Sequence, residues 1–474
     1  MKKGLLVAWM LFVGIAMGWG QQAKYVFYFI GDGMGVNHVN GTETYRAELE
    51  GRIGIKPLLF SGFPSATMAT TYSATNGVTD SAASGTALAT SRKTKNGTLG
   101  LLADKQIEVS SLAVWAHRAG ARVGIATSVS VDHATPAAFY AHVAKRSDYY
   151  AVGKDLIDAG FEFYAGSDFQ KPVNKKVPEE GSLYEQCERA GYTLARGINE
   201  YASKAGAAQK MILLQTEEAS RVDRTAIPYA INRQEGDLTL TQITQAAVDF
   251  LDRGEDKGFF LMVEGGKIDW ACHVNDAATA FREVMDLDSA VAVAYEFYRQ
   301  HPDETLIVVT ADHETGGLVL GTGKYELNLQ ALQYQRVSVD GFSRILNELR
   351  KSTNNQVTWE MVEKSLRENF GFGEMVKLNK KQEARLHKVF KETFVDGQAA
   401  YDQSLYQKDE RLATVACAIM NEIAMVGWVS GSHSNGYVPV YAIGAGADKF
   451  HARTDNAEIP LKIAEAAGWL QPSE

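Results

Sequence analysis

The residues most able to do chemistry form the run TDSAASGTA at positions 79–87. This run sets a hydroxyl beside an acid where small residues and glycine let a loop pass tightly into a helix. A serine at a helix N-terminus meets unpaired backbone N–H groups and a dipole that favours an anion. The run therefore fits a nucleophile that carries a phosphoryl group, although Ser or Thr beside Asp is also an ordinary helix cap. Residue chemistry alone does not choose among Ser81, Ser84 and Thr86.

Four groups of hard metal ligands follow the predicted strands or lie close to them. They are Asp32, then Glu264, Asp269 and His273, then Asp312 and His313, and finally His433 in the SGSHSNG loop at 430–436. In open α/β sheets, ligands bind at the carboxyl ends of strands. Asp269 and His273 are four residues apart, so on a helix both point from one face. Carboxylate and imidazole are normal zinc ligands, and the set as a whole indicates metal binding, although any single histidine is more commonly structural.

A further motif, DHATPAA at 132–138, precedes Arg146 by eight residues. Thr135 stands before a proline, which predicts a non-helical backbone and a hydroxyl that can face a site. Arg146 could clamp a phosphate through its planar fork of donors, or it could be a solvated surface charge.

Short apolar runs separated by helical patterns surround these motifs. The runs at 25–30, 122–126, 258–263, 305–310 and 438–444 are typical of buried strands. Helical patterns such as 109–120 and 239–253 lie between them. The alternation predicts an α/β fold with a mostly parallel central sheet.

Residues 324–430 show a different pattern, with four amphipathic helical stripes and almost none of the candidate ligands. The stripes are Phe342, Ile345, Leu346 and Leu349; Trp359, Val362, Leu366 and Phe370; Leu386, Val389, Phe390 and Phe394; and Leu412, Val415, Ile419 and Ile423. Asn379 and Gln382 form a helix-start signal before the third stripe. We interpret 324–430 as a helical insertion within one α/β domain spanning 21–474, lying over the rim of the site or at a subunit contact.

Composition and charge exclude some classes of protein. The 474 residues carry a net charge of −9, so the chain lacks the basic footprint of a nucleic-acid binder. Residues 1–20 have a basic start, an apolar run and small residues, which is the pattern of a signal peptide, with an uncleaved anchor as the alternative. Three widely spaced cysteines predict no disulfide framework. We expect an exported protein, periplasmic or secreted, with no stable membrane span after processing.

Taken together, the motifs resemble those of the alkaline phosphatase family. GDGMG at 31–35, TDSAASGTA at 79–87, DHATPAA at 132–138, VEGGKIDWACH at 263–273, TADHETGG at 310–317 and SGSHS at 430–434 match in order. The resemblance covers about 20–320 and 430–450, is loose over 150–240 and leaves out 324–430. It implies a three-layer α/β sandwich with a large central sheet.

The resemblance also implies a site with two Zn²⁺ and one Mg²⁺. Asp269, His273 and His433 would hold one zinc, and Asp32, Asp312 and His313 the second, with Ser81 reaching it. Asp32, Thr135 and Glu264 would form the magnesium site, since Mg²⁺ takes oxygen ligands. Ser81 would be the nucleophile, and Arg146 would bind the phosphate oxygens.

Two positions that vary in this family are His133 and Trp270 here. His133 could touch the third metal or orient its waters from outside, which leaves Mg²⁺ or Zn²⁺ open at that site. Trp270 adds no charge against phosphate, so we expect easier product release than with Lys.

The leading prediction is an exported hydrolase of small phosphate monoesters, acting through a phosphoserine. Alternatives are a phosphodiesterase, sulfatase or phosphosugar mutase of the same fold, or a non-catalytic phosphate- or metal-binding protein. The resemblance suggests a homodimer. The natural alcohol is not predictable, because selectivity depends on loops around the pocket.

Overall fold

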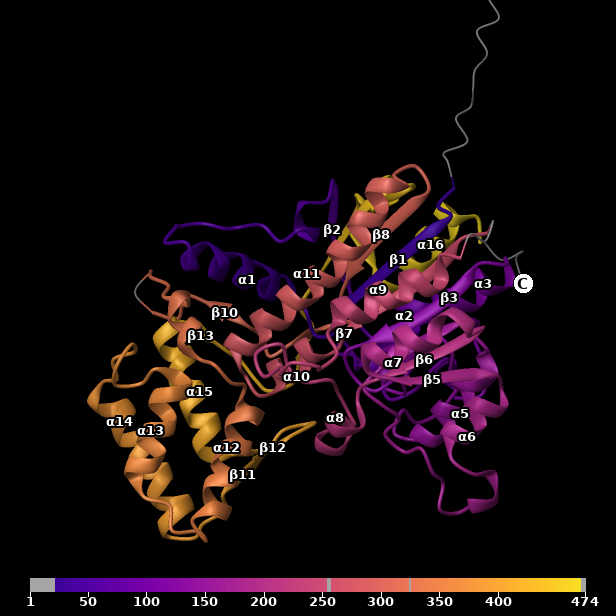
Figure 1. Cartoon of the computed structure of the whole chain (residues 1–474). Coiled ribbons are helices and arrows are strands. Elements are labelled where there is room, and N and C mark those ends of the chain that lie inside the picture. Colours follow the sequence, from indigo (N-terminus) through magenta and orange to yellow (C-terminus); the bar gives the residue numbers. More distant parts are fainter. Residues whose placement is uncertain (1–21, 254–256, 324, 470–474) are drawn as a thin grey trace, which may run out of the picture.

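The structure is a computed structural model that describes residues 22–253, 257–323 and 325–469. The predicted signal peptide at 1–20 lies outside this range. Among the described residues, a ten-stranded sheet with the strand order β16-β2-β15-β8-β1-β7-β3-β4-β6-β5 forms the centre (Figure 1). In that order the strands are Thr454–Asp455, Ser65–Thr70, Val438–Gly444, Thr305–Thr310, Tyr25–Gly31, Phe259–Gly265, Arg122–Thr127, Phe163–Gly166, Lys210–Leu214 and Tyr192–Arg196.

The sheet is parallel except at β15. The central strands β8, β1, β7 and β3 pair in parallel, as do β3, β4, β6 and β5. β15 runs antiparallel to both β8 and β2. The predicted mostly parallel α/β sheet is therefore confirmed. The orientation of β15 brings its first residues to the edge where β8 and β1 end.

Helices cover both faces of the sheet. α9 (Leu240–Leu251) and α11 (Ala277–Gln300) pack on one face, and α3 (Leu112–Arg118), α4 (Ala134–Ala137) and α16 (Ile459–Ala467) pack on the other. The side chains of β1 alternate accordingly: Phe27 meets Phe297 of α11, while Tyr28 meets Phe139 after α4. This is the period-two alternation of a strand buried on both faces, and it produces a three-layer sandwich.

The remaining helices lie at the ends and sides of these layers. Their bounds are α1 Val36–Leu49, α2 Ser81–Thr90, α5 Tyr149–Ala159, α6 Leu183–Arg189, α7 Gly197–Lys204, α8 Glu217–Val222, α10 Lys267–His273, α12 Val339–Ser352, α13 Trp359–Phe370, α14 Lys380–Phe390 and α15 Arg411–Ala424.

The four helices expected between residues 324 and 430 are α12 to α15, seen in orange to yellow at the lower left of Figure 1. Asn379 caps α14 with Gln382 in a capping box, as the helix-start signal predicts. Their stripes form a second hydrophobic core, which also takes in Tyr45 of α1 and Phe281 of α11. A hairpin of β11 (Tyr401–Gln403) and β12 (Lys408–Glu410) precedes α15.

Candidate active site

The nucleophile candidate opens helix α2. Asp80 is the N-cap, and its carboxylate accepts a hydrogen bond from the Ala83 N–H at 3.0 Å. The helix cap is therefore Asp80, which leaves the hydroxyl of Ser81 free of that role. Ser81 is buried, and its Oγ lies 3.3 Å from Nε2 of His313.

The other two hydroxyls of the motif are used within the fold. The Ser84 hydroxyl donates to the backbone carbonyl of Asp312 and accepts from Asn456. Thr86 donates to the carbonyl of Thr98 at 3.3 Å. Of the three candidates, only Ser81 faces the ligand groups within the part of the chain that the structure describes.

A glycine allows α2 to lie close to the next motif. A Cβ on Gly85 would stand 3.2 Å from Cβ of Ala138 and 3.3 Å from Cα of Thr135. Both distances are tighter than normal contacts, so a side chain here would push α2 away from α4. Gly85 thus sets how near Ser81 lies to Thr135.

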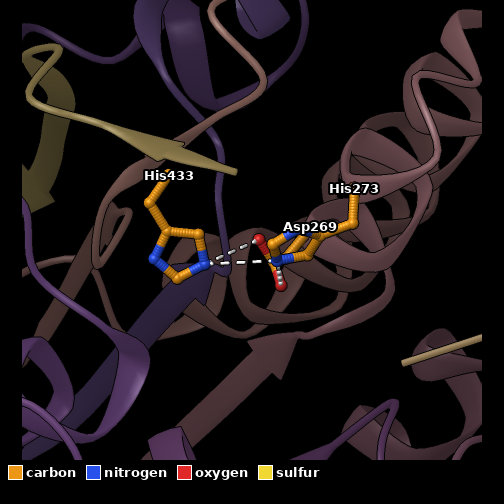
Figure 2. A group of neighbouring side chains, drawn as sticks. All are labelled: Asp269, His273 and His433. Atoms are coloured by element: carbon orange, nitrogen blue, oxygen red, sulfur yellow. Dashed lines mark hydrogen bonds and ion pairs between the residues drawn. The ribbon is translucent and has the colours of Figure 1, made fainter. Parts of the chain in front are cut away.

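The first ligand cluster joins Asp269, His273 and His433 (Figure 2). Nε2 of His273 lies 3.2 Å from Oδ2 of Asp269 and 3.2 Å from Nε2 of His433. The first two residues lie on α10, one turn apart, as their spacing predicts. His433 lies in the short strand β14 (His433–Ser434) rather than in a plain loop, and β14 pairs with β9 (Glu314–Thr315).

The hydrogen bonds of these two histidines fix which nitrogen faces the cluster. Nδ1 of His273 is 2.7 Å from the carbonyl oxygen of Gly431, and Nδ1 of His433 is 2.9 Å from that of Thr79. A carbonyl only accepts, so each Nδ1 carries a proton and each ring turns its Nε2 toward the cluster. The two Nε2 atoms lie 3.2 Å apart, so a cation bound between them would take a lone pair from each. A histidine that binds a metal through one ring nitrogen commonly donates the N–H of the other to a carbonyl oxygen, as the Nδ1 atoms do here.

The second cluster joins Asp32, Asp312 and His313. Nε2 of His313 lies 3.3 Å from Oδ1 of Asp32 and 3.4 Å from Oδ2 of Asp312. Its Nδ1 is 3.2 Å from the hydroxyl oxygen of Thr315, and that hydroxyl donates to Asp269 at 2.5 Å. Thr315 therefore links the two clusters, a role that the sequence motifs did not reveal.

A third group joins Asp32, Glu264 and His133. The Thr135 hydroxyl lies beside it and donates to Oδ2 of Asp312 at 3.4 Å. The expected non-helical backbone at Thr135 is wrong: the residue lies in α4, because proline is tolerated in the first turn of a helix. Glu264 is the second-last position of the seven-residue strand β7 rather than following the strand.

Three observations show that these residues fit metal ions. Both carboxylate oxygens of Asp32, Oε1 of Glu264 and Oδ2 of Asp269 are buried without a hydrogen-bond partner. Burial raises the pKa of Asp312 to about 7 and that of Glu264 to about 8, because it disfavours the ionised forms. Buried carboxylates need a compensating charge, and oxygen and imidazole donors are what Zn²⁺ and Mg²⁺ take.

Arg146 faces the same space from the loop before α5. Its Nη1 donates to Asp80 at 3.2 Å, while its Nη2 lies 3.3 Å from Nε2 of His133 and 3.4 Å from the Tyr406 hydroxyl. Its backbone N–H donates to the carbonyl of Gly97. The side chain is 19 % exposed and faces the ligand groups, so it is not a solvated surface charge.

Tyr406 is the site residue that sequence reasoning missed. It lies in the turn of the β11–β12 hairpin, and its ring stacks on Trp270 with centroids 4.7 Å apart and planes at 15°. The edges of His133 and His273 also contact it, at 5.8 and 5.3 Å between centroids. The 324–430 segment therefore reaches the rim of the site, and no motif in the sequence marks the tyrosine that does so.

The fold and these groups define a class of protein: a metal-dependent α/β hydrolase, here with a buried serine and a largely buried arginine beside the ligand clusters. The family model described as alkaline phosphatase matches residues 23–162 and 182–469. The match includes 324–430, which the motifs left outside the resemblance. The chain belongs to the alkaline phosphatase family and is a phosphatase.

Individual relatives agree with that assignment. Alkaline phosphatase 4 of Bacillus subtilis is 32% identical over 392 residues, covering 81% of this chain and 76% of the relative. The cold-active alkaline phosphatase of Shewanella sp. has a TM-score of 0.78 at 28% identity, covering 94% of this chain and 99% of that one. The Thermus thermophilus alkaline phosphatase gives 0.77 at 25% identity, covering 95% and 94%. The family is metal-dependent and implies small phosphomonoester substrates.

The described part of the chain contains no helix that has both the length and the apolar character needed to span a membrane.

Proposed function

We propose that this phosphatase is an exported hydrolase of phosphate monoesters that works through a phosphoserine at Ser81, with two Zn²⁺ and one Mg²⁺. The observation that carries the proposal is the position of the Ser81 hydroxyl, 3.3 Å from Nε2 of His313 and at the N-terminus of α2. That hydroxyl thus lies beside a ligand cluster and under backbone donors that favour a phosphoryl group.

The residues that would hold the metals follow the three groups. Asp269, His273 and His433 would hold one zinc, Asp32, Asp312 and His313 the other, and Asp32, Glu264 and Thr135 the magnesium. When bound, such ions lower the pKa of a hydroxyl or water and stabilise the entering and leaving oxygens of an in-line displacement.

The serine takes the phosphoryl group and then gives it up. Oγ of Ser81 loses its proton and attacks phosphorus, while the bond from phosphorus to the alcohol oxygen breaks and the alcohol leaves with a proton. Water then attacks the phosphoserine, the bond to Oγ breaks, and Ser81 regains a proton as inorganic phosphate departs.

Arg146 is the group placed to hold the phosphate oxygens. Its guanidinium presents parallel N–H donors, which match the geometry of phosphate oxygens. The carboxylate of Asp80 holds one side of that fork and also caps the helix of Ser81. Nucleophile and clamp are therefore positioned by one residue.

The hydrogen bond from Arg146 supports an orienting role for His133. A guanidinium only donates, so Nε2 of His133 accepts, and the neutral ring carries its proton on Nδ1. Burial, followed by the charge of Arg146, lowers the pKa of His133 to about 3, so the ring stays neutral. Its Nδ1–H lies 4.0 Å from Oε1 of Glu264. A protonated nitrogen orients a carboxylate or a water and does not ligate a metal.

A substrate panel on the purified, metal-loaded protein tests the proposal. We expect release of p-nitrophenol from its phosphate monoester at far higher kcat/KM than from bis(p-nitrophenyl) phosphate or p-nitrophenyl sulfate. Preferred cleavage of the diester or the sulfate would support the alternatives in the same fold, and binding of phosphate without turnover would indicate a non-catalytic protein. Metal analysis of the same sample gives the zinc and magnesium content.

Export and assembly are separate parts of the proposal. The pattern of residues 1–20 supports cleavage of a signal peptide and a periplasmic or secreted protein. Cell fractionation with N-terminal sequencing of the full-length product tests this, and an intact Met1 would contradict cleavage. The family resemblance supports a homodimer, which sedimentation equilibrium of the mature protein tests.

A further inference from the structure

A cavity of about 430 Å³ opens beside the first ligand cluster. It lies between the end of α10, the loop before β14 and the β11–β12 hairpin. His273, Asn275, Asp402, Leu405, Asp409 and Gly431 are among the residues that line it. His273 and Gly431 form one wall of the cavity. The hydrogen bond between these two residues is also the one that orients His273 toward the cluster.

The position of Ser81 indicates which part of a substrate this cavity faces. Ser81 lies against His313, in the second cluster, whereas His273 belongs to the first. In an in-line displacement the entering and leaving oxygens are on opposite sides of phosphorus, and a two-metal site stabilises one at each metal. The leaving alcohol would therefore point toward the cluster of His273, whose side chain belongs both to that cluster and to the cavity lining.

The two ionisable residues other than His273 that line this cavity are both acidic. Asp409 is 2% exposed, and its Oδ1 is buried without a hydrogen-bond partner. Asp402 is exposed and accepts a hydrogen bond from Thr414 at 2.7 Å. A buried carboxylate oxygen without a donor is a costly arrangement that a cationic or donating ligand would relieve.

The basic residues of the same hairpin region do not neutralise this lining. The Lys408 ammonium lies 4.6 Å from the ring centroid of Tyr401, and Arg411 pairs with Glu392 at 3.0 Å. Among the described residues that line the cavity, none is Lys or Arg. The described lining therefore presents two carboxyl groups and, apart from His273, no basic side chain.

We propose that this cavity binds the alcohol part of the substrate and favours alcohols that carry a cationic group, such as an ammonium. The proposal rests on the phosphomonoesterase function described above, since it assigns the alcohol side of the same site. An ammonium on the leaving alcohol can meet Asp402, which is exposed, while Asp409 belongs to the same lining. An alcohol that carries a carboxylate or a second phosphate meets like charge instead.

Three small monoesters of similar size separate charge from shape. They are ethanolamine phosphate, n-propyl phosphate and phosphoglycolate, which bear a cationic, a neutral and an anionic alcohol part. We expect kcat/KM of the metal-loaded enzyme to fall in that order, by about five-fold per step for exposed or half-buried charge pairs. Equal values for the three, with hydrolysis intact, overturn the inference and leave the phosphatase function standing. Loss of hydrolysis of all three contradicts the function itself.

Substitutions on the hairpin test whether its acidic residues cause the preference for a cationic alcohol. Asp402→Asn should reduce the ratio of ethanolamine phosphate to phosphoglycolate, and Asp402→Lys should reverse it. Asp396→Asn is the matched control, because Asp396 is exposed on the same segment and does not line the cavity. A ratio that is unchanged in Asp402→Lys, or that shifts equally in the control, overturns the inference.

A binding measurement that does not depend on turnover completes the test. Calorimetry with 3-aminopropylphosphonate and n-butylphosphonate compares a cationic and a neutral analogue that cannot be hydrolysed. We expect tighter binding of the amino compound, and loss of that difference in Asp402→Lys. Equal affinities in the unaltered protein contradict the cationic preference.

Discussion

The strand ends and the β11–β12 hairpin contribute to the same site in opposite ways. The strand ends supply buried, mutually oriented ligands in short motifs. The hairpin supplies Tyr406, Asp402 and Asp409, three residues without a motif, on a segment with its own hydrophobic core. In the proposed function the difference separates chemistry from selectivity: the first region would act at phosphorus, and the second would contact the group attached to it.

The largest test of this contrast is the nucleophile at the strand-end side. Ser81→Ala should lower kcat by about 10⁴-fold or more, which is typical when a nucleophile is removed. Acid quenching followed by mass spectrometry should find a phosphoryl group on the peptide of Ser81 in the unaltered enzyme. Ser84→Ala is the control that should keep the label. Zinc-dependent hydrolysis that survives Ser81→Ala would falsify the covalent mechanism.

The second test concerns the buried carboxyls when metal is removed. The pKa values of Asp312 and Glu264 are raised to about 7 and about 8 by burial. The folded metal-free protein thus holds more protons than the unfolded chain between about pH 4 and pH 8, so its free energy of unfolding falls as the pH rises. We expect a lower Tm at about pH 8 than at about pH 5 after chelation, and a smaller difference in Glu264→Gln. Metal loading should abolish the fall, because metals bind the ionised forms; equal Tm values without metal would contradict the account.

On the hairpin side, Tyr406 should matter less. Tyr406→Phe removes the hydroxyl that meets Arg146 and should lower kcat/KM about two- to five-fold, the usual worth of a hydrogen bond. Tyr406→Ala also removes the stack on Trp270 and should cost about ten-fold. Tyr401→Phe, on the same hairpin but bonded to Asn347, should leave steady-state kinetics unchanged. An effect of Tyr406→Phe as large as that of Ser81→Ala would erase the contrast between the regions.

The smallest expected effect is at Trp270, where the two regions touch. Trp270→Lys should strengthen inhibition by inorganic phosphate about five-fold or less, because it adds a cation near the anion. Trp270→Met is the control: it also removes the stack on Tyr406 but adds no charge, so it should not strengthen phosphate inhibition. Phosphate inhibition that is the same in Trp270→Lys and in the unaltered enzyme would contradict the expectation of easier product release.

The contrast also explains how much of the fold could be predicted from the sequence. Continuous apolar strands such as β1 and β8 are evident because both their faces are buried. β2 and β5 carry small, polar or half-exposed residues, and no apolar run marks them. β15 runs antiparallel because of how it pairs with β8 and β2. The direction of that pairing cannot be predicted from the residues of β15 alone.

The same holds for the site. Asp269 and His273 could be paired from helical spacing, and the motifs placed Asp32 and Asp312 at strand ends. Tyr406 could not be predicted, because its role depends on how a distant hairpin folds back onto α10. Thr315 lies inside a recognised motif. Its link between the clusters, however, depends on which ring nitrogen of His313 carries the proton, and a sequence does not show that.

The carboxylate of Asp80 binds three separate parts of the chain: the first turn of α2, the Gly97 amide and the guanidinium of Arg146. In the proposed mechanism two of them, the start of α2 and Arg146, hold the groups that attack and bind the substrate. Substitutions at positions 80, 81 and 146 are therefore epistatic, because each changes the background against which the others act.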